Sequence, residues 1–376
     1  LLMVANAQRG LEDVGCAARA RSGAEIVSVT GSVGKTTAKE MLRLALGALG
    51  TVHASAGSLN NHWGVPLTLA QMPRDAKYAV VEIGMNHFGE IRILNSFVRP
   101  HLALVTAIAP AHLEFFGSCE AIADAKSEIF ESLVQGGPAI LPADSPWCER
   151  LVARAKMAGV TDIRTFGERG RDAKLVSASE DANGLTVRAE ICDVPVSFRL
   201  GAAGRHNAVD ALGALLCVAA LDGDVANAAA ALKEFTALKG RGARLKIGGV
   251  TVIDESYNAN PASMAAALSV LAGAEGRKIA VLGDMLEMGR DADDRHAGLA
   301  AAVAASRADA VFLCGPHMKA LWEKLPAPMR GAYAEDSAKL APEAAAALRP
   351  GDTVLVKGSN GSRMSAVIDA VKARMG

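Results

Sequence analysis

The stretch I-V-S-V-T-G-S-V-G-K-T-T, residues 26–37, decides the fold of this chain. An apolar strand over residues 25–29 is predicted to run into a glycine turn, which delivers Lys35 and two threonines to the start of a helix. Glycines let backbone N–H groups approach phosphate oxygens, and a helix N-terminus favours negative charge. Lys35 supplies a positive charge near the β- and γ-phosphates, and Thr36 can place its hydroxyl on Mg²⁺. The stretch therefore predicts a site for ATP or GTP.

The loop departs from the full Walker A pattern, which has glycine five residues before Gly34, where this chain has Val29. An ordinary Gly/Ser turn followed by a helix-capping residue is the alternative interpretation. The residues after the loop favour the nucleotide site, because they continue as a helix with apolar side chains at helical spacing. These are Ala38, Met41, Leu42, Ala45 and Leu49.

Length and composition limit the classes of protein to consider. The 376 residues suffice for two or three domains, and the 40 basic residues balance 40 acidic ones, so no basic surface for nucleic acid is indicated. No apolar run is long enough to cross a membrane, and no signal peptide is visible. The six cysteines are scattered and form no C-x-x-C pair, which is typical of reduced thiols in a cytosolic protein. We therefore expect a cytoplasmic location.

Buried apolar strands alternate with helices in the first half of the chain. Residues 78–84, 102–108 and 138–141 predict such strands, and this alternation is typical of a parallel sheet covered by helices on both faces. Between about 160 and 200 the pattern changes. Residues 187–191 and 196–200 alternate in polarity, and Asn183-Gly184 is a predicted hairpin turn, so an antiparallel extension of the sheet is expected.

The expected fold class is α/β, with a P-loop domain followed by a smaller Rossmann-like domain. Residues 1–20 are predicted to be a helix or linker left from a preceding domain, and residues 21–238 the central ATP-binding domain. A glycine-rich joint at residues 239–242 marks the boundary. Residues 239–376 are predicted to form the second, doubly wound domain, with strands at residues 251–254, 278–282 and 353–356.

Several polar residues follow predicted strands, where ligands gather in open α/β sheets. Glu82 ends one strand and His112 follows another, so both are candidates for a metal site beside Thr36. Taken singly, an exposed carboxylate and a loop histidine bonded to backbone are the simpler interpretations. Asp254 opens a polar cluster that is either a second such site or an Asn/Pro-rich turn. Lys126 lies on a predicted helix and, from the residues alone, is expected to be a solvated lysine.

The order of these motifs along nearly the whole chain resembles the Mur ligase family. The resemblance rests on T-G-S-V-G-K-T-T, S-L-N-N-H-W-G-V-P-L-T, E-I-G-M-N-H-F-G-E-I, A-H-L-E-F-F-G-S with A-K-S-E-I, G-R-H-N, K-G-R, D-E-S-Y-N-A-N-P-A-S-M, V-L-G-D-M-L-E-M-G and V-K-G-S. The D-E-S-Y-N-A-N-P and V-L-G-D-M-L-E-M-G segments are similar to those of the family member that adds D-alanyl-D-alanine.

The resemblance implies a role for each matching residue. It implies that ATP phosphates bind the loop of Gly31, Ser32, Val33, Gly34, Lys35, Thr36 and Thr37. Thr36 and Glu82 would hold one Mg²⁺, and His112 and Lys126 a second, with Lys126 carbamylated by CO₂. Nucleotide contact or domain closure is implied for Asn207, Arg241, Asp254, Tyr257 and Asn258. Substrate binding is implied for Asn60, Asn61, Lys357 and Ser359. Catalytic roles are implied for Lys35, His112, Lys126, Arg241 and Asp254.

The activity implied by the resemblance is ATP-dependent amide ligation in peptidoglycan precursor synthesis. The family member joins D-alanyl-D-alanine to UDP-N-acetylmuramoyl-tripeptide through an acyl phosphate, giving ADP and phosphate, and a monomer is expected. The alternatives are another amide ligase of the superfamily, such as a folylpolyglutamate synthase, a P-loop small-molecule kinase, or a nucleotide-binding regulatory module without turnover.

Three departures from the family pattern are apparent. Ala107 and Asp210 stand where the family usually has asparagine, so a hydrogen bond near the metals or the adenosine is expected to be weaker. The family's amino-terminal, uridine-binding domain has no counterpart, so we expect that an upstream piece is missing and that these residues alone have little or no ligase turnover.

Overall fold

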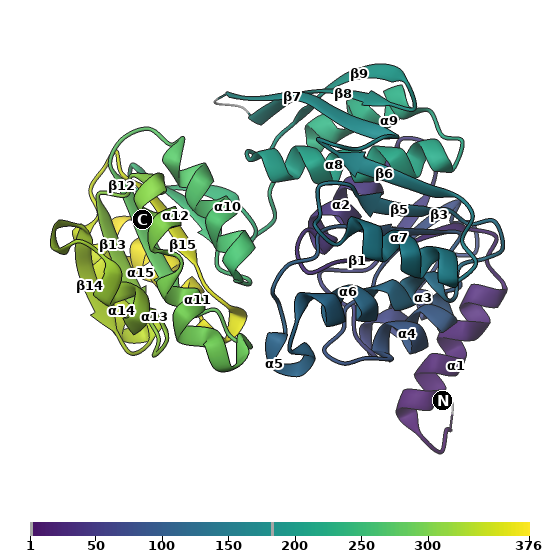
Figure 1. Ribbon diagram of the computed structural model, residues 1–376, viewed down its shortest axis with the longest axis horizontal. Coiled ribbons are helices and arrows are strands. Elements are labelled where there is room, and N and C mark those ends of the chain that lie inside the picture. The colour runs from purple at the N-terminus through teal and green to yellow at the C-terminus, as the bar shows by residue number, and fades with distance from the viewer. Residues whose placement is uncertain (1–2, 182–183) are drawn as a thin grey trace. The chain divides into compact units, whose positions relative to one another are not determined.

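The computed structural model describes residues 3–181 and 184–376. The chain folds as two compact units (Figure 1). The first unit comprises residues 1–108, 118–201 and 205–235, and the second comprises residues 236–376 together with the short segments 109–117 and 202–204. Each unit has its own sheet and its own hydrophobic core. The α/β fold class predicted from the sequence is confirmed.

The first unit alternates strands and helices as far as β6 and then continues as a run of strands. Its strands are β1 Glu25–Thr30, β2 Val52–Ala54, β3 Tyr78–Glu82, β4 Leu102–Val105, β5 Ala139–Pro142, β6 Ile163–Gly167, β7 Ala173–Asp181, β8 Gly184–Ile191 and β9 Val194–Leu200. Its helices are α1 Ala7–Ala20, α2 Lys35–Gly47, α3 Gly64–Ala70, α4 Glu90–Val98, α6 Cys119–Ser127, α7 Cys148–Met157, α8 Arg205–Ala220 and α9 Val225–Ala231.

The nine strands form one sheet in the order β2-β3-β1-β4-β5-β6-β7-β8-β9. The strands from β2 to β7 pair in parallel, whereas β7, β8 and β9 pair antiparallel. Strands β1, β3, β4 and β5 are almost wholly buried, as expected for a parallel sheet with helices on both faces. Helices α2, α8 and α9 contact one another, as do α1, α3 and α4. The predicted antiparallel extension is confirmed.

The second unit is a smaller α/β sandwich. Its strands are β10 Ala243–Ile247, β11 Val250–Glu255, β12 Lys278–Gly283, β13 Ala310–Cys314, β14 Arg330–Ala334 and β15 Thr353–Lys357. Its helices are α5 Leu113–Phe116, α10 Pro261–Ala272, α11 Ala292–Ala297, α12 Ala300–Ser306, α13 Met318–Lys324, α14 Ser337–Ala347 and α15 Ser365–Met375. The strand order is β10-β11-β15-β12-β13-β14, parallel except for the β10–β11 hairpin.

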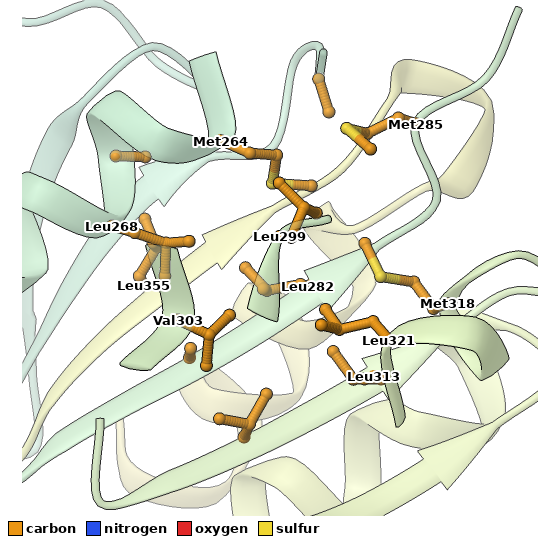
Figure 2. Packing of buried hydrophobic residues seen from close by; sticks show 14 of the residues in the cluster. Met264, Leu268, Leu282, Met285, Leu299, Val303, Leu313, Met318, Leu321 and Leu355 are labelled. Carbon is orange, nitrogen blue, oxygen red and sulfur yellow. The ribbon is translucent and has the colours of Figure 1, made fainter. Parts of the chain in front are cut away.

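Alternate residues of the second sheet supply two separate cores. Leu282, Leu313 and Leu355 face α10, α12 and α13, where they pack with Met264, Leu268, Val303 and Leu321 (Figure 2). Val281, Val354 and Val356 belong to the opposite core with α14 and α15. Because successive side chains of a strand point to opposite faces, this alternation buries both sides of the sheet. The sheet is therefore doubly wound, as the sequence predicts.

Several element boundaries differ from the sequence-based expectation. Within the predicted helix or linker of residues 1–20, helix α1 begins only at Ala7, because the Asn6 side chain accepts a hydrogen bond from Arg9 N and caps the helix there. The β8–β9 hairpin turns at Cys192 and Asp193, with φ of 49° and 64°. The predicted Asn183-Gly184 turn includes a residue outside the described residues. None of the helices in the described ranges is long and apolar enough to span a membrane.

Candidate active site

The loop between β1 and α2 approaches its neighbours so closely that only glycine fits at two positions. Gly31 has φ of 154°, and a Cβ there would lie 1.9 Å from Thr106 Oγ1. Gly34 has φ of 87°, and its Cβ would lie 2.7 Å from Asp210 Oδ2. Gly34 is also the N-cap of α2 and makes no side-chain capping bond. The first backbone N–H groups of α2 are therefore left for an anion, which the helix dipole favours.

The segment after β4 supports this loop. Thr106 Oγ1 donates to Val33 O at 2.5 Å, and Ser32 N donates to Ala107 O at 2.6 Å. The departure at Ala107 therefore leaves its backbone contact with the loop intact. Among the described residues, Ser32 Oγ is buried and has no hydrogen-bond partner, and Lys35 Nζ donates to Gly31 O at 2.7 Å. A buried hydroxyl without a partner and a lysine folded over the loop fit a phosphate group, which would accept from both.

Thr36 in the first turn of α2 and Glu82 at the end of β3 come together, as the sequence predicts. Thr36 Oγ1 donates to Glu82 Oε2 at 2.9 Å, and Asn60 Nδ2 donates to Glu82 Oε1 at 2.7 Å. The Glu82 side chain is fully buried. Hydroxyl and carboxylate oxygens are the ligands that Mg²⁺ prefers, so the pair fits that ion. In the described parts of the chain, no group of three or more His, Cys, Asp and Glu side chains is arranged to hold a metal.

Lys126 is buried, with 2% of its surface exposed, so the expectation of a solvated lysine was wrong. Its helix, α6, turns this residue inward together with Ile122, Ala123 and Ala125. Burial lowers the pKa of Lys126 well below its ordinary value, and the positive charge of Lys35 lowers it further. The lowered pKa increases the neutral fraction of the Lys126 amine, and the neutral form is the nucleophilic one.

Asp210 lies against the phosphate-binding loop, on the second turn of α8. Burial raises the pKa of this carboxyl well above its ordinary value. A carboxylate beside a phosphate site would repel the nucleotide, whereas the protonated acid is neutral. Protonation of Asp210, which the raised pKa favours, would lessen this repulsion.

His112 groups with the second unit, whereas Thr36, Glu82 and Lys126 belong to the first. Its ring Nδ1 lies 2.5 Å from Glu287 Oε2, and Glu114 N donates to Glu287 O at 3.2 Å. Both His112 and Glu287 adopt left-handed backbone conformations, with φ of 57° and 62°. A carboxylate beside one ring nitrogen fixes the orientation of the imidazole, as it does for histidines that bind metals through the other nitrogen.

Asp254 holds the glycine-rich joint. Its Oδ2 accepts from Gly240 N at 2.9 Å, and its Oδ1 accepts from Ser256 N at 3.1 Å and from Ser256 Oγ at 2.6 Å. The Arg241 guanidinium lies 4.0 Å from the centre of the Tyr257 ring, which is cation–π geometry. Asp254, Arg241 and Tyr257 are thus brought together.

Lys357 and Ser359 join this cluster because β15 is the parallel neighbour of β11. Lys357 Nζ donates to Glu255 Oε2 at 3.2 Å and to Asn258 O at 3.0 Å. Ser359 Oγ accepts from Leu286 N at 2.9 Å. The carboxyl ends of adjacent strands therefore gather the predicted residues at one edge of the second sheet.

Asn61 and Asn207 also lie in the first unit. Asn61 Oδ1 accepts from Trp63 N at 3.1 Å and from Gly64 N at 3.0 Å, so it stabilises the turn into α3. Asn207 is buried in the first turn of α8.

Sequence reasoning missed Ser58 and Lys39 in the first unit, and His296 with Asp284 in the second. Ser58 Oγ lies 3.4 Å from Thr36 Oγ1, and Lys39 anchors the loop that carries Ser58. In the second unit, His296 Nε2 accepts from Met285 N at 2.9 Å beside Asp284. Ser58 and Asp284 lie in motifs already singled out, but Lys39 gives no signal, because a helical lysine is usually solvated.

Comparison with known proteins places the chain in a family. The Mur ligase middle domain matches residues 29–218, and the Mur ligase glutamate ligase domain matches residues 240–360. This chain belongs to the Mur ligase family of enzymes.

Within the family, the similar proteins point to one type of ligase. The UDP-N-acetylmuramoyl-tripeptide–D-alanyl-D-alanine ligase of Rickettsia prowazekii is 32% identical over 371 residues, which cover 98% of this chain and 83% of that protein. A crystal structure of MurF from Acinetobacter baumannii has a TM-score of 0.91 at 31% identity, covering 99% of this chain and 82% of that one. These relatives confirm the resemblance found in the sequence.

A folylpolyglutamate synthase from Mycobacterium tuberculosis, complexed with ADP, is a more distant neighbour. It has a TM-score of 0.76 at 17% identity and covers 96% of this chain and 93% of that one. At this identity the likeness concerns the fold alone. The amide ligase named in the sequence-based alternatives is therefore a less similar protein than the MurF relatives.

Proposed function

We propose that this chain is an ATP-dependent ligase that joins D-alanyl-D-alanine to UDP-N-acetylmuramoyl-tripeptide, as the names of its relatives describe for those proteins. The proposal also includes a division of the chain into residues 1–20, 21–238 and 239–376. It further includes a cytoplasmic location and a monomeric state. The observation that carries it is the phosphate-binding loop beside the paired Thr36 and Glu82 side chains.

The loop residues Gly31 to Thr37 would hold the phosphates of ATP. Backbone N–H groups at the start of α2, the buried Ser32 hydroxyl and the Lys35 ammonium all present donors there. Lys35 would hold its positive charge against the phosphoryl oxygens as negative charge develops on them.

Two Mg²⁺ ions are proposed, one at Thr36 and Glu82 and a second at His112 and Lys126. When bound, Mg²⁺ would neutralise charge on the transferring phosphoryl group. Thr36 and Glu82 already lie within hydrogen-bond distance of each other, which supports the first site. For the second, the lowered pKa of Lys126 supports carbamylation, because only the neutral amine can form a C–N bond with CO₂, with loss of one proton. The product is a carboxylate-like oxygen ligand.

The remaining residues are proposed to bind the organic parts of the substrates. Asn60 and Asn61 would contact the muramoyl peptide. Asn207, Arg241, Asp254, Tyr257 and Asn258 would contact the nucleotide or act in domain closure about the joint at residues 239–242, and Lys357 and Ser359 would lie near the reacting groups. The hydrogen bonds of Asp254 to Gly240 and Ser256 support a role in shaping the joint rather than in proton transfer.

The proposed reaction has two steps. A carboxylate oxygen of the tripeptide attacks the γ-phosphorus of ATP, the bond to the β-γ bridging oxygen breaks, and ADP leaves. The amine of D-alanyl-D-alanine then attacks the acyl carbon, loses a proton and expels phosphate, which leaves an amide. Lys35 would stabilise charge in the first step, and the buried surroundings of Glu82 and Lys126 would limit the access of water to the acyl phosphate.

The test is substrate-dependent release of phosphate from ATP by the purified full-length protein. We expect release only when both D-alanyl-D-alanine and UDP-N-acetylmuramoyl-tripeptide are present, together with one new amide product by mass spectrometry. Equal release with and without these substrates would contradict the proposal. A parallel assay with folylpolyglutamate precursors and glutamate tests the alternative of a folylpolyglutamate synthase, which would release phosphate with those substrates. A small-molecule kinase would give a phosphorylated product without an amide.

A further inference from the structure

Lys39 is a fully buried lysine on α2, one turn after the phosphate-binding loop. Its Nζ donates to Ser55 O and to Gly57 O, each at 2.7 Å, and lies 2.8 Å from Glu40 Oε1. An ammonium has three N–H donors, and three acceptors surround this one. A buried charge held this completely is costly to remove, because the two carbonyls and the carboxylate would lose their partner.

The two carbonyls belong to the start of the loop that follows β2. Ser55 is fixed in the sheet, since its N donates to Val80 O at 3.0 Å and its Oγ accepts from Glu82 N at 3.1 Å. Lys39 therefore holds the backbone at residues 55 and 57 by hydrogen bonds. The residues that follow, 58–60, lie beside Thr36 and Glu82.

The same loop delivers two side chains to the Thr36–Glu82 pair. Ser58 Oγ lies 3.4 Å from Thr36 Oγ1, and Asn60 Nδ2 donates to Glu82 Oε1 at 2.7 Å. Each oxygen of the Glu82 carboxylate is thus oriented by a neighbour, Oε2 by Thr36 and Oε1 by Asn60. The placement of Asn60 depends on a loop that begins at the carbonyls bound by Lys39.

We propose that Lys39 is a positioning residue for the magnesium and nucleotide site. It holds residues 55–60 so that Asn60 and Ser58 keep the Glu82 carboxylate and the Thr36 hydroxyl in the orientation that receives Mg²⁺–ATP. This inference rests on the proposed function for the identity of the ligand. Lys39 itself touches neither the ion nor the nucleotide in this role.

The experiment compares Lys39→Met with the unchanged chain in binding of a fluorescent ATP analogue at increasing Mg²⁺ concentration. Methionine keeps the length and burial of the side chain but removes all three donors. We expect the Mg²⁺ concentration that gives half-maximal nucleotide binding to rise about 10- to 100-fold, as for other residues that orient metal ligands. Binding of the analogue in EDTA should change little.

Two further variants separate positioning from general stability. Lys278→Met is the matched control, because Lys278 Nζ donates to a helix carbonyl, Ala272 O, at 2.8 Å in the second unit. It should lower the unfolding temperature without moving the Mg²⁺ dependence. Glu40→Gln keeps the two carbonyl bonds of Lys39 and should also leave the Mg²⁺ dependence unchanged.

The proposal is overturned if Lys39→Met binds Mg²⁺–nucleotide as the unchanged chain does while only its unfolding temperature falls. If Lys39→Met does not fold, Lys39→Arg replaces it, because a planar guanidinium cannot reach the same three acceptors in the same directions. A shifted Mg²⁺ dependence in the folded arginine variant supports the proposal, and an unshifted one contradicts it. Because no acceptor substrate is used, these outcomes do not depend on whether the ligase reaction itself is correct.

Discussion

At the residue scale, the site contains two buried lysines whose sequence pattern is that of ordinary surface lysines. Lys39 and Lys126 both lie on amphipathic helices, and both are at most 2% exposed. Lys39 has three acceptors around it, whereas Lys126 has its pKa lowered by burial and by Lys35. The two buried lysines therefore differ because their surroundings differ: the Lys39 amine is held by three acceptors, whereas burial and the charge of Lys35 lower the pKa of Lys126.

The first prediction at this scale concerns Lys126. We expect Lys126→Ala to lower substrate-dependent phosphate release about 100-fold, because an orienting or ligating group at the metal is lost. Short carboxylates such as acetate should restore part of the activity by supplying the missing oxygen ligand. Carbamylation is checked separately with ¹³C-bicarbonate, which should give a carbamate carbon signal in the unchanged chain and none in the variant. Full activity of Lys126→Ala without carboxylate would contradict the proposed role.

The second prediction is a pH dependence that arises from Asp210. Burial raises the pKa of this acid in the folded chain above its unfolded value of about 3.9, so the folded state keeps a proton that the unfolded state has lost. The free energy of unfolding therefore falls as pH rises above about 4, until the folded pKa is passed. Asp210→Asn removes this pH-dependent loss, so the free energy of unfolding of the variant should increase with pH relative to that of the unchanged chain.

Urea unfolding of both proteins at a series of pH values measures this difference. Parallel stability curves for the two proteins would contradict the prediction, because they would show that the pKa of Asp210 is the same in the folded and unfolded states.

At the element scale, the turn between β1 and α2 combines backbone conformation with close packing. Gly34 is left-handed, and its α-carbon lies against the Asp210 carboxyl group, while Thr106 packs against Gly31. The loop is thus shaped by α8 and by the segment after β4 as much as by its own residues. This packing holds the loop in shape although Val29 stands where the Walker A pattern has glycine. The N-terminus of α2 has no side-chain cap.

The prediction at this scale is that Gly34→Ala weakens nucleotide binding. A left-handed alanine costs about 1–2 kcal/mol, and the new methyl group would displace Asp210 and with it the loop. Gly159→Ala is the control, since Gly159 also has a left-handed φ of 83° but no atoms within 4 Å of an added Cβ. Both variants should lose similar free energy of unfolding in urea from backbone strain, with a further loss for Gly34→Ala. Only Gly34→Ala should lose Mg²⁺–ATP affinity in calorimetry.

At the scale of the whole molecule, two units with separate sheets and cores share one chain. The nine-stranded sheet carries the phosphate loop, Glu82 and Lys126, and the six-stranded sheet carries Asp254, Lys357 and Ser359 at one edge. The segment 109–117, with His112, belongs to the second unit although it follows β4 of the first. Each unit buries its own apolar side chains, so each has its own source of stability.

The prediction for the whole molecule is that the two units unfold in separate thermal transitions. Mg²⁺–ATP at 100 times its dissociation constant should stabilise the first unit by about 2.7 kcal/mol and raise the temperature of its transition. Differential scanning calorimetry with hydrogen exchange assigns each transition to its unit. Lys35→Ala should abolish the shift. A shift of equal size in that variant would show that the ligand acts elsewhere.

The sequence by itself determined the α/β class, the glycine loop between a strand and a helix, the antiparallel extension of the first sheet and the meeting of Thr36 with Glu82. These features follow from local patterns, because a glycine turn between a strand and a helix, and polar residues at the ends of parallel strands, are fixed by neighbours in the chain. The resemblance to the Mur ligase family also came from the order of motifs, and the comparisons confirmed it.

Only the tertiary structure decided the burial of Lys126 and Lys39, the start of α1 at Ala7 and the pairing of His112 with Glu287. Residues 112 and 287 are far apart in the chain, and no local pattern records that they meet. A helical lysine looks solvated in any sequence, because the atoms that cover it come from other elements. Burial, pKa and the orientation of metal ligands depend on those contacts, and they appear only when the chain has folded.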